Sequence, residues 1–186
     1  PKTYAAIHST KEKDFDIVLS NIEAAVRHKK QYGFSCAIGA QMLLLPENKD
    51  EALILTKRMK EIGVDYVVIK PYSQHQFSDT RKYEDLSYNS MMNLERELLL
   101  LNSEHFNIFF RSHTMNKLNA NKKYQKCYST PFSWAYIMSD GSLYGCSAYL
   151  KQPEFCYGNL NDKTFQELWE GKDRKKSLEY IQNSLD

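Results

Sequence analysis

The chain of 186 residues has few of the residues that mark disordered or fibrous proteins, with only 7 glycines and 5 prolines. Hydrophobic residues make up 42% of it and charged residues 26%, which is typical of a globular protein, so disorder is not indicated. The length suits one full domain, or one domain with a small appendage.

The sequence also lacks an excess of charge and any long apolar run. Its 25 basic and 23 acidic residues leave a net charge of +2, which predicts neither a nucleic-acid partner nor an anionic membrane surface. No apolar run approaches the roughly 18 residues of a membrane span. No signal peptide is visible, although the chain begins at Pro1 rather than Met, as a processed or excised protein would.

Cysteine is too scarce for a disulfide scaffold, since the chain contains four. Three of the four lie within residues 127–156. Such clustering indicates a reducing compartment and a metal-binding role, and we expect a cytoplasmic protein.

The cysteine-rich stretch contains a predicted β-hairpin. Two short runs of aromatic and β-branched residues flank Ser139, Asp140 and Gly141, and Asp-Gly is a strong turn signal because Gly accepts a positive φ. A hairpin brings its ends together, so Cys127 and Cys146 could meet. Two or three thiolates gathered in this way suit a soft metal or an iron–sulfur cluster.

The first 112 residues alternate between strand and helix patterns, which predicts an α/β sheet or barrel. We expect strand 34–45 to be buried on both faces because it is almost continuously apolar. Asn48 and Glu51 form a predicted capping box at the next helix. The expected strands are 3–8, 34–45, 64–70 and 106–110, and the expected helices are 14–30, 48–62 and 87–101. The long polar loop 71–88 follows a strand, where loops often carry function.

From His113 the pattern changes. Residues 113–133 are polar without periodicity, and the hairpin follows. A capping box at Thr164 and Glu167 predicts a helix over 165–170, and the last helix is expected over 173–184. We therefore predict two domains, 1–112 and 113–186.

The cysteine spacing resembles a known family. Cys127, thirteen residues, Gly141, four residues and Cys146 form a C-x13-G-x4-C pattern. This pattern, with the following Gly158-Asn159-Leu160 and the segment 165–171, is similar to the SPASM or twitch extension of radical S-adenosylmethionine (radical SAM) enzymes. Residues 15–22 and 63–70 resemble later β/α units of the barrel of those enzymes. The resemblance implies a partial radical SAM barrel followed by a small α+β domain that holds an auxiliary cluster.

The sequence departs from the family in two places. The C-x3-C-x2-C motif that binds the SAM-cleaving cluster is absent, and about four strands are expected where the family has six. The Cys-x2-Cys that completes the auxiliary site would follow at about Asp186. We therefore expect a piece of a larger enzyme that is inactive alone; a natural degenerate homologue is the alternative.

The resemblance implies the chemistry of the parent enzyme. A reduced [4Fe–4S] cluster there splits S-adenosyl-L-methionine, and the resulting 5′-deoxyadenosyl radical takes a hydrogen atom from the substrate. The implied partners are an external electron donor and a peptide or small-molecule substrate, such as a sugar. The oligomeric state is left open.

Cys127 and Cys146 are the expected auxiliary-cluster ligands, with Cys156 as a third or as a residue that the downstream pair replaces. The alternative is a structural zinc site with His113 as fourth ligand, in a non-catalytic α/β binding module with a zinc-stabilised C-terminal lobe. Cys36 lies among apolar neighbours, so we expect a buried core thiol.

Three polar residues resemble SAM contacts of the family: Ser9 and Lys70, which end expected strands, and Gln41, which interrupts the apolar strand 34–45. For Gln41, a polar group within an apolar strand needs a partner, and a backbone hydrogen bond is the alternative to SAM. Tyr72, His75 and Arg111 would line the same substrate rim. For these and for the strand ends, simple solvation is the alternative.

Overall fold

The computed structural model describes residues 1–75, 77–118, 127 and 132–184. The chain divides into two compact units. The first unit comprises residues 1–74 and 80–120, and the second comprises residues 75–79 and 121–186. None of the described helices is long and apolar enough to cross a membrane.

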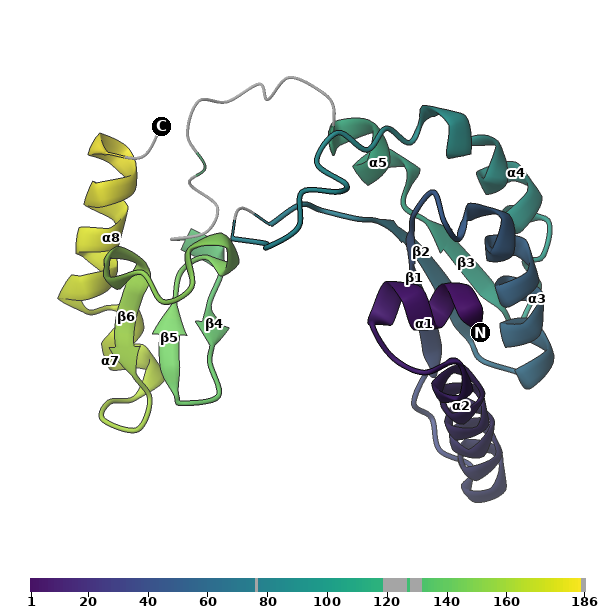
Figure 1. The fold of residues 1–186 in the computed structure, drawn as a ribbon. Coiled ribbons are helices and arrows are strands. Elements are labelled where there is room, and N and C mark those ends of the chain that lie inside the picture. The colour runs from purple at the N-terminus through teal and green to yellow at the C-terminus, as the bar shows by residue number, and fades with distance from the viewer. Residues whose placement is uncertain (76, 119–126, 128–131, 185–186) are drawn as a thin grey trace. The chain divides into compact units, whose positions relative to one another are not determined.

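The first unit is built on a parallel three-stranded sheet with helices packed on it (Figure 1). The strands β1 (Gly39–Leu44), β2 (Tyr66–Pro71) and β3 (Asn107–Phe110) lie in the order of the sequence. Helix α3 (Ala52–Ile62) joins the first two, and α4 (Asn93–Leu99) joins the last two. The remaining elements of this unit are α1 (Lys2–His8), α2 (Glu12–Tyr32), α5 (Ser112–Leu118) and the 3-10 turns η1 (Lys49–Glu51) and η2 (Asn89–Met91).

Within the described residues, helices cover one face of this sheet and leave the other bare. Side chains alternate along each strand, and Leu44, Ile69 and Phe110 join one core with Met59 of α3 and Leu98 of α4. The opposite face leaves Leu43 42% and Phe109 52% exposed. The prediction of a strand buried on both faces is therefore wrong. Both crossover helices lie on the same side, which is the arrangement of a singly wound sheet.

Helix α2 is tied to the beginning of β2 by an ion pair. Lys29 Nζ lies 2.7 Å from the Asp65 carboxylate, and the backbone N–H of Ile38 also donates to that carboxylate at 2.5 Å. Together these two bonds hold the pKa of Asp65 below its usual value, the Lys29 contact contributing most. Helix α2 ends at Gly33, which adopts a positive φ of 66°.

Three local predictions for the first unit are wrong. Residues 3–8 lie in helix α1 instead of a strand, which reduces the parallel sheet to three strands. Asn48 does not cap a helix: its side chain accepts from the Leu45 N–H and donates to the Leu43 carbonyl, so it braces the turn after β1. Ser112–Leu118 form helix α5, which the polar sequence concealed because Met115 is its only buried residue.

In its described residues, the second unit has a small antiparallel sheet and helices α7 (Phe165–Trp169) and α8 (Lys172–Asn183). Strands β4 (Tyr136–Ile137), β5 (Ser142–Tyr144) and β6 (Cys156–Asn159) follow in order, with turns η3 (Ser147–Tyr149) and η4 (Pro153–Phe155) between the last two. Helices α7 and α8 come after the sheet. Leu143, Tyr157 and Leu168 form its core. The predicted capping box is confirmed, because Thr164 and Glu167 exchange hydrogen bonds at the start of α7.

Candidate metal centre

The hairpin turn forms where the Asp-Gly pair predicts it. Gly141 has φ 86°, and its N–H donates to the Met138 carbonyl at 2.9 Å. The Met138 N–H donates in turn to the Ser142 carbonyl at 2.9 Å. The Asp140 carboxylate accepts from the Ser142 N–H, which lowers the pKa of Asp140. The turn is thus fixed by its own residues.

The end of β6 and the two residues after it support this turn from the other side. The side-chain amides of Asn159 and Asn161 both donate to the Asp140 carbonyl, at 2.9 and 3.1 Å. The Leu160 N–H donates to the Gly141 carbonyl at 2.9 Å. The Gly-Asn-Leu motif therefore has a structural role: it anchors the third strand against the hairpin that carries Cys146.

The hairpin and the strand beside it position two of the candidate ligands. Cys146 is half-buried two residues after the end of β5, where it precedes turn η3. Cys156 is half-buried at the start of β6, opposite Tyr144 of β5. Burial and the nearby Cys156 both raise the pKa of Tyr144. Cys127, the third candidate, is exposed.

The ligand assignment itself stays a prediction. No three His, Cys, Asp or Glu side chains of the described ranges gather as metal ligands, although residues 128–131, next to Cys127, lie outside those ranges. His113, the expected fourth ligand of a zinc site, lies in helix α5 of the first unit. Cys36 is exposed, so the prediction of a buried core thiol is wrong: β1 begins only at Gly39, and residues 34–38 are not part of the strand.

A buried tyrosine lies against the backbone just before Cys146, and the sequence pattern did not reveal it. The hydroxyl of Tyr157 occupies the space where a side chain at residue 145 would begin, since a Cβ built on Gly145 would lie 2.0 Å from Tyr157 Oη. Tyr157 is 2% exposed. The sequence shows a glycine, Gly145, next to a candidate ligand. Its role is visible only in the structure, because it depends on a contact with Tyr157, twelve residues further along the chain.

The comparison with protein families identifies the second unit. A small hairpin domain with cysteines at its ends is the class of structure that binds soft metals or clusters. Residues 127–185 match the family model of the SPASM iron–sulfur cluster-binding domain, so this part of the chain is a SPASM domain. The match confirms the SPASM resemblance and is consistent with a fragment of a SPASM-containing radical SAM enzyme. Neither a curated protein nor a solved structure matches the chain.

In the first unit, two of the three residues predicted to contact SAM share the open face of the parallel sheet. Lys70 of β2 pairs with Leu43 of β1, and Gln41 lies two residues before Leu43, so Gln41 and Lys70 point to the same side. Gln41 is exposed, and Lys70 is half-buried. Ser9 does not end a strand: it is the C-terminal cap of helix α1, with φ 51°, so the reason for placing it at a strand end no longer holds.

Of the residues expected at the substrate rim, Tyr72 and Arg111 directly follow strands of the first unit, whereas His75 belongs to the second unit. The Tyr72 N–H donates to the buried hydroxyl of Tyr88 at 2.7 Å, and that hydroxyl donates to the Leu44 carbonyl at 2.9 Å. Tyr88 thereby links the ends of β1 and β2, and burial raises its pKa. Arg111 is exposed directly after β3. His75 belongs to the second unit, where its Nε2 lies 3.2 Å from the Ser147 carbonyl oxygen.

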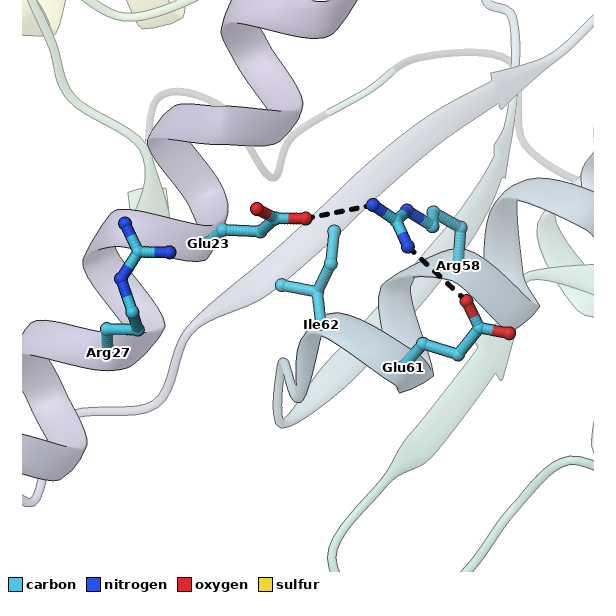
Figure 2. Close-up of a pocket in the computed structure, with 5 residues that line it drawn as sticks. All are labelled: Glu23, Arg27, Arg58, Glu61 and Ile62. Carbon is cyan, nitrogen blue, oxygen red and sulfur yellow. Dashed lines mark hydrogen bonds and ion pairs between the residues drawn. The ribbon is translucent and has the colours of Figure 1, made fainter.

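A hollow of about 210 Å³ lies between helices α2 and α3 (Figure 2). The charged side chains that line it form a network of ion pairs at the surface. Arg58 contacts Glu23 at 3.0 Å and Glu61 at 3.6 Å, as Figure 2 shows. These side chains are between 34% and 66% exposed. Exposed pairs of this kind contribute little to stability.

Proposed function

We propose that the chain is part of a radical SAM enzyme and supplies later β/α units of its barrel together with an auxiliary iron–sulfur domain. The observation that carries the proposal is the SPASM match over residues 127–185. SPASM domains occur in radical SAM enzymes, which supports an enzymatic role at a coarse level. The substrate class, a peptide or a small metabolite such as a sugar, is part of the proposal.

The first unit supports the barrel part of this proposal. Its three strands are parallel, follow the order of the sequence, and receive both crossover helices on one face. In a singly wound barrel the helices surround the strands, and the bare face of the sheet points inward. Leu43 and Phe109 remain exposed on that bare face. Further strands of a barrel would cover them.

The second unit supports a cluster held by its cysteines. Cys127 and Cys146 are the proposed ligands, because they occupy the C-x13-G-x4-C positions of the family pattern. Cys156 is either a third ligand or a residue with a role in the sheet alone. It is the first residue of β6, and its backbone pairs with Tyr144 of β5. Thiolates suit the site because soft, charged sulfur stabilises iron.

The proposed reaction is that of the parent enzyme. In that parent enzyme, a cluster that has accepted one electron from an external donor would supply the reductive cleavage of S-adenosyl-L-methionine, which would give methionine and the 5′-deoxyadenosyl radical for hydrogen abstraction from the substrate. Gln41 and Lys70 are the proposed contacts to S-adenosyl-L-methionine. Their place on the bare face of the sheet is compatible with a ligand inside the barrel.

Anaerobic reconstitution of the chain with iron and sulfide tests the proposal. We expect iron and sulfide to be incorporated, and we expect S-adenosyl-L-methionine to remain intact under reducing conditions, because C-x3-C-x2-C is absent. The products to measure are 5′-deoxyadenosine and methionine. An iron-free protein that takes up one equivalent of zinc would favour the alternative, a binding module with a zinc-stabilised lobe. Cleavage by this chain alone would disprove the expected inactivity.

A further inference from the structure

A β-bulge turns Tyr157 toward the residue before Cys146. In the pairing of β5 with β6, Leu143 is opposite Gly158 and Tyr144 is opposite Cys156, so Tyr157 has no counterpart. An extra residue in one strand bends that strand and redirects its side chain. The ring of Tyr157 enters the core beside Leu168, and its hydroxyl reaches the backbone of Gly145.

The Tyr157 hydroxyl is buried without a hydrogen-bond partner within the described part of the chain. Ser177 Oγ of helix α8 is in the same condition. Both residues are almost fully buried, Tyr157 at 2% and Ser177 at 1% exposure, and neither hydroxyl forms a hydrogen bond with good geometry within the described residues. Buried polar groups are almost always satisfied, so a pair of unsatisfied hydroxyls beside a candidate ligand indicates an acceptor that completes the arrangement.

The surroundings of this hydroxyl suit a negatively charged acceptor. A phenol hydroxyl can donate a hydrogen bond, and Tyr157 holds its hydroxyl in the interior of the unit, against the backbone of Gly145. Arg174 lies one helical turn before Ser177 and stacks on Trp169, with its guanidinium carbon 4.0 Å from the ring centroid. Helix α8 thus carries a cation and a buried hydroxyl one turn apart.

We propose that the Tyr157 hydroxyl donates a hydrogen bond to the sulfur of Cys146 when that sulfur binds the auxiliary cluster, and that Ser177 donates in turn to the Tyr157 oxygen. Tyr157 is then a positioning residue that raises the reduction potential of the cluster. Hydrogen bonds to cluster sulfurs stabilise the reduced state, which carries one more negative charge. This inference rests on the proposed function, because it requires a cluster at Cys146.

Gly145 makes the contact possible. Any side chain at residue 145 would occupy the position of the hydroxyl, and the Gly145 N–H already donates to the Phe155 carbonyl at 3.0 Å. The glycine therefore allows the phenol to approach the backbone at the ligand while the strand pairing continues. The rival explanation is a purely structural contact between Tyr157 and Ser177, which would not affect the potential of a cluster.

The test is an anaerobic redox titration of the reconstituted chain, followed by EPR of the reduced cluster. The variants are Tyr157→Phe, Ser177→Ala and, as matched control, Tyr180→Phe, which removes a phenol hydroxyl from the same unit. We expect a more negative midpoint potential in Tyr157→Phe, a smaller shift in the same direction in Ser177→Ala, and the wild-type potential in Tyr180→Phe. Iron content and thermal unfolding, measured in parallel, show that each variant is folded and loaded.

The possible results separate the two hypotheses. A wild-type chain that incorporates no cluster overturns the proposed function and this inference with it. A loaded Tyr157→Phe variant with the wild-type potential overturns the inference alone. A shift that Tyr180→Phe reproduces also overturns it, because the effect would then belong to any lost hydroxyl of this unit.

Discussion

At the scale of single residues, the second unit depends on contacts that only a glycine or a small polar group permits. Gly141 adopts the positive φ of the hairpin turn, and Gly145 leaves room for Tyr157. Asn159 and Asn161 then fix the turn through the Asp140 carbonyl. Cys146 follows this reinforced hairpin, so its position is determined by residues that do not bind metal themselves.

Replacing Gly145 by alanine should destabilise the second unit. The new Cβ would lie 2.0 Å from Tyr157 Oη, so the tyrosine must move, and overpacking of this kind costs about 1–3 kcal/mol. Both tryptophans, Trp134 and Trp169, belong to this unit, so urea unfolding followed by tryptophan fluorescence reports on it alone. The double variant Gly145→Ala with Tyr157→Phe should lose less free energy of unfolding than the sum of the losses in the two single variants. Simple additivity would contradict the contact.

At the scale of secondary-structure elements, the sequence predicted most helices and strands but not the exposure of the sheet. Helix α2, the strands β2 and β3, the hairpin and the capping box at Thr164 follow from periodicity and turn residues. The sequence could not show that β1 is bare on one face, because apolar residues occupy that face too. Residues 3–8 failed for a related reason: their apolar residues suit a helix as well as a strand, and α1 buries none of them.

The candidate site was predictable only in part. The Cys-Gly-Cys spacing predicts Cys127 and Cys146 as ligands, and the hairpin turn at Gly141 within that spacing forms as expected. The role of Tyr157 was hidden, since a bulge redirects its side chain and no periodicity records a bulge. The expected contact residues Gln41 and Lys70 share a face because strand parity is regular, whereas Ser9 depended on a strand that does not form.

The ion pair between helix α2 and strand β2 predicts a dependence on pH. Lys29 and the Ile38 amide lower the pKa of Asp65, so this carboxylate stabilises the fold above its ordinary pKa of about 3.9 and loses that contribution as the pH falls through its lower folded value. Asp65→Asn should therefore cost about 1 kcal/mol or less at neutral pH, given partial exposure.

Urea unfolding followed by circular dichroism at pH 7 and at about pH 3 measures this dependence. The difference between wild type and Asp65→Asn should shrink at the lower pH. The control is Asp16→Asn, because Asp16 is exposed and lies on helix α2, which also carries Lys29. A difference that grew on acidification would contradict the assigned role of the ion pair.

At the scale of the whole molecule, the two units supply different parts of one proposed enzyme. The parallel unit has a bare sheet face with Gln41 and Lys70 on it. The SPASM unit has a hairpin whose end carries Cys146. The central claim is that the cysteines of the family pattern bind an iron–sulfur cluster, while Cys36, exposed in the first unit, does not.

The most direct test counts iron in single cysteine variants after anaerobic reconstitution. Cys127→Ser and Cys146→Ser should each lose most of the iron that the wild-type chain binds, because each removes a proposed thiolate ligand. Cys36→Ser should retain it, and Cys156→Ser decides whether that residue is a third ligand. The claim is contradicted if Cys127→Ser and Cys146→Ser bind as much iron as the wild type.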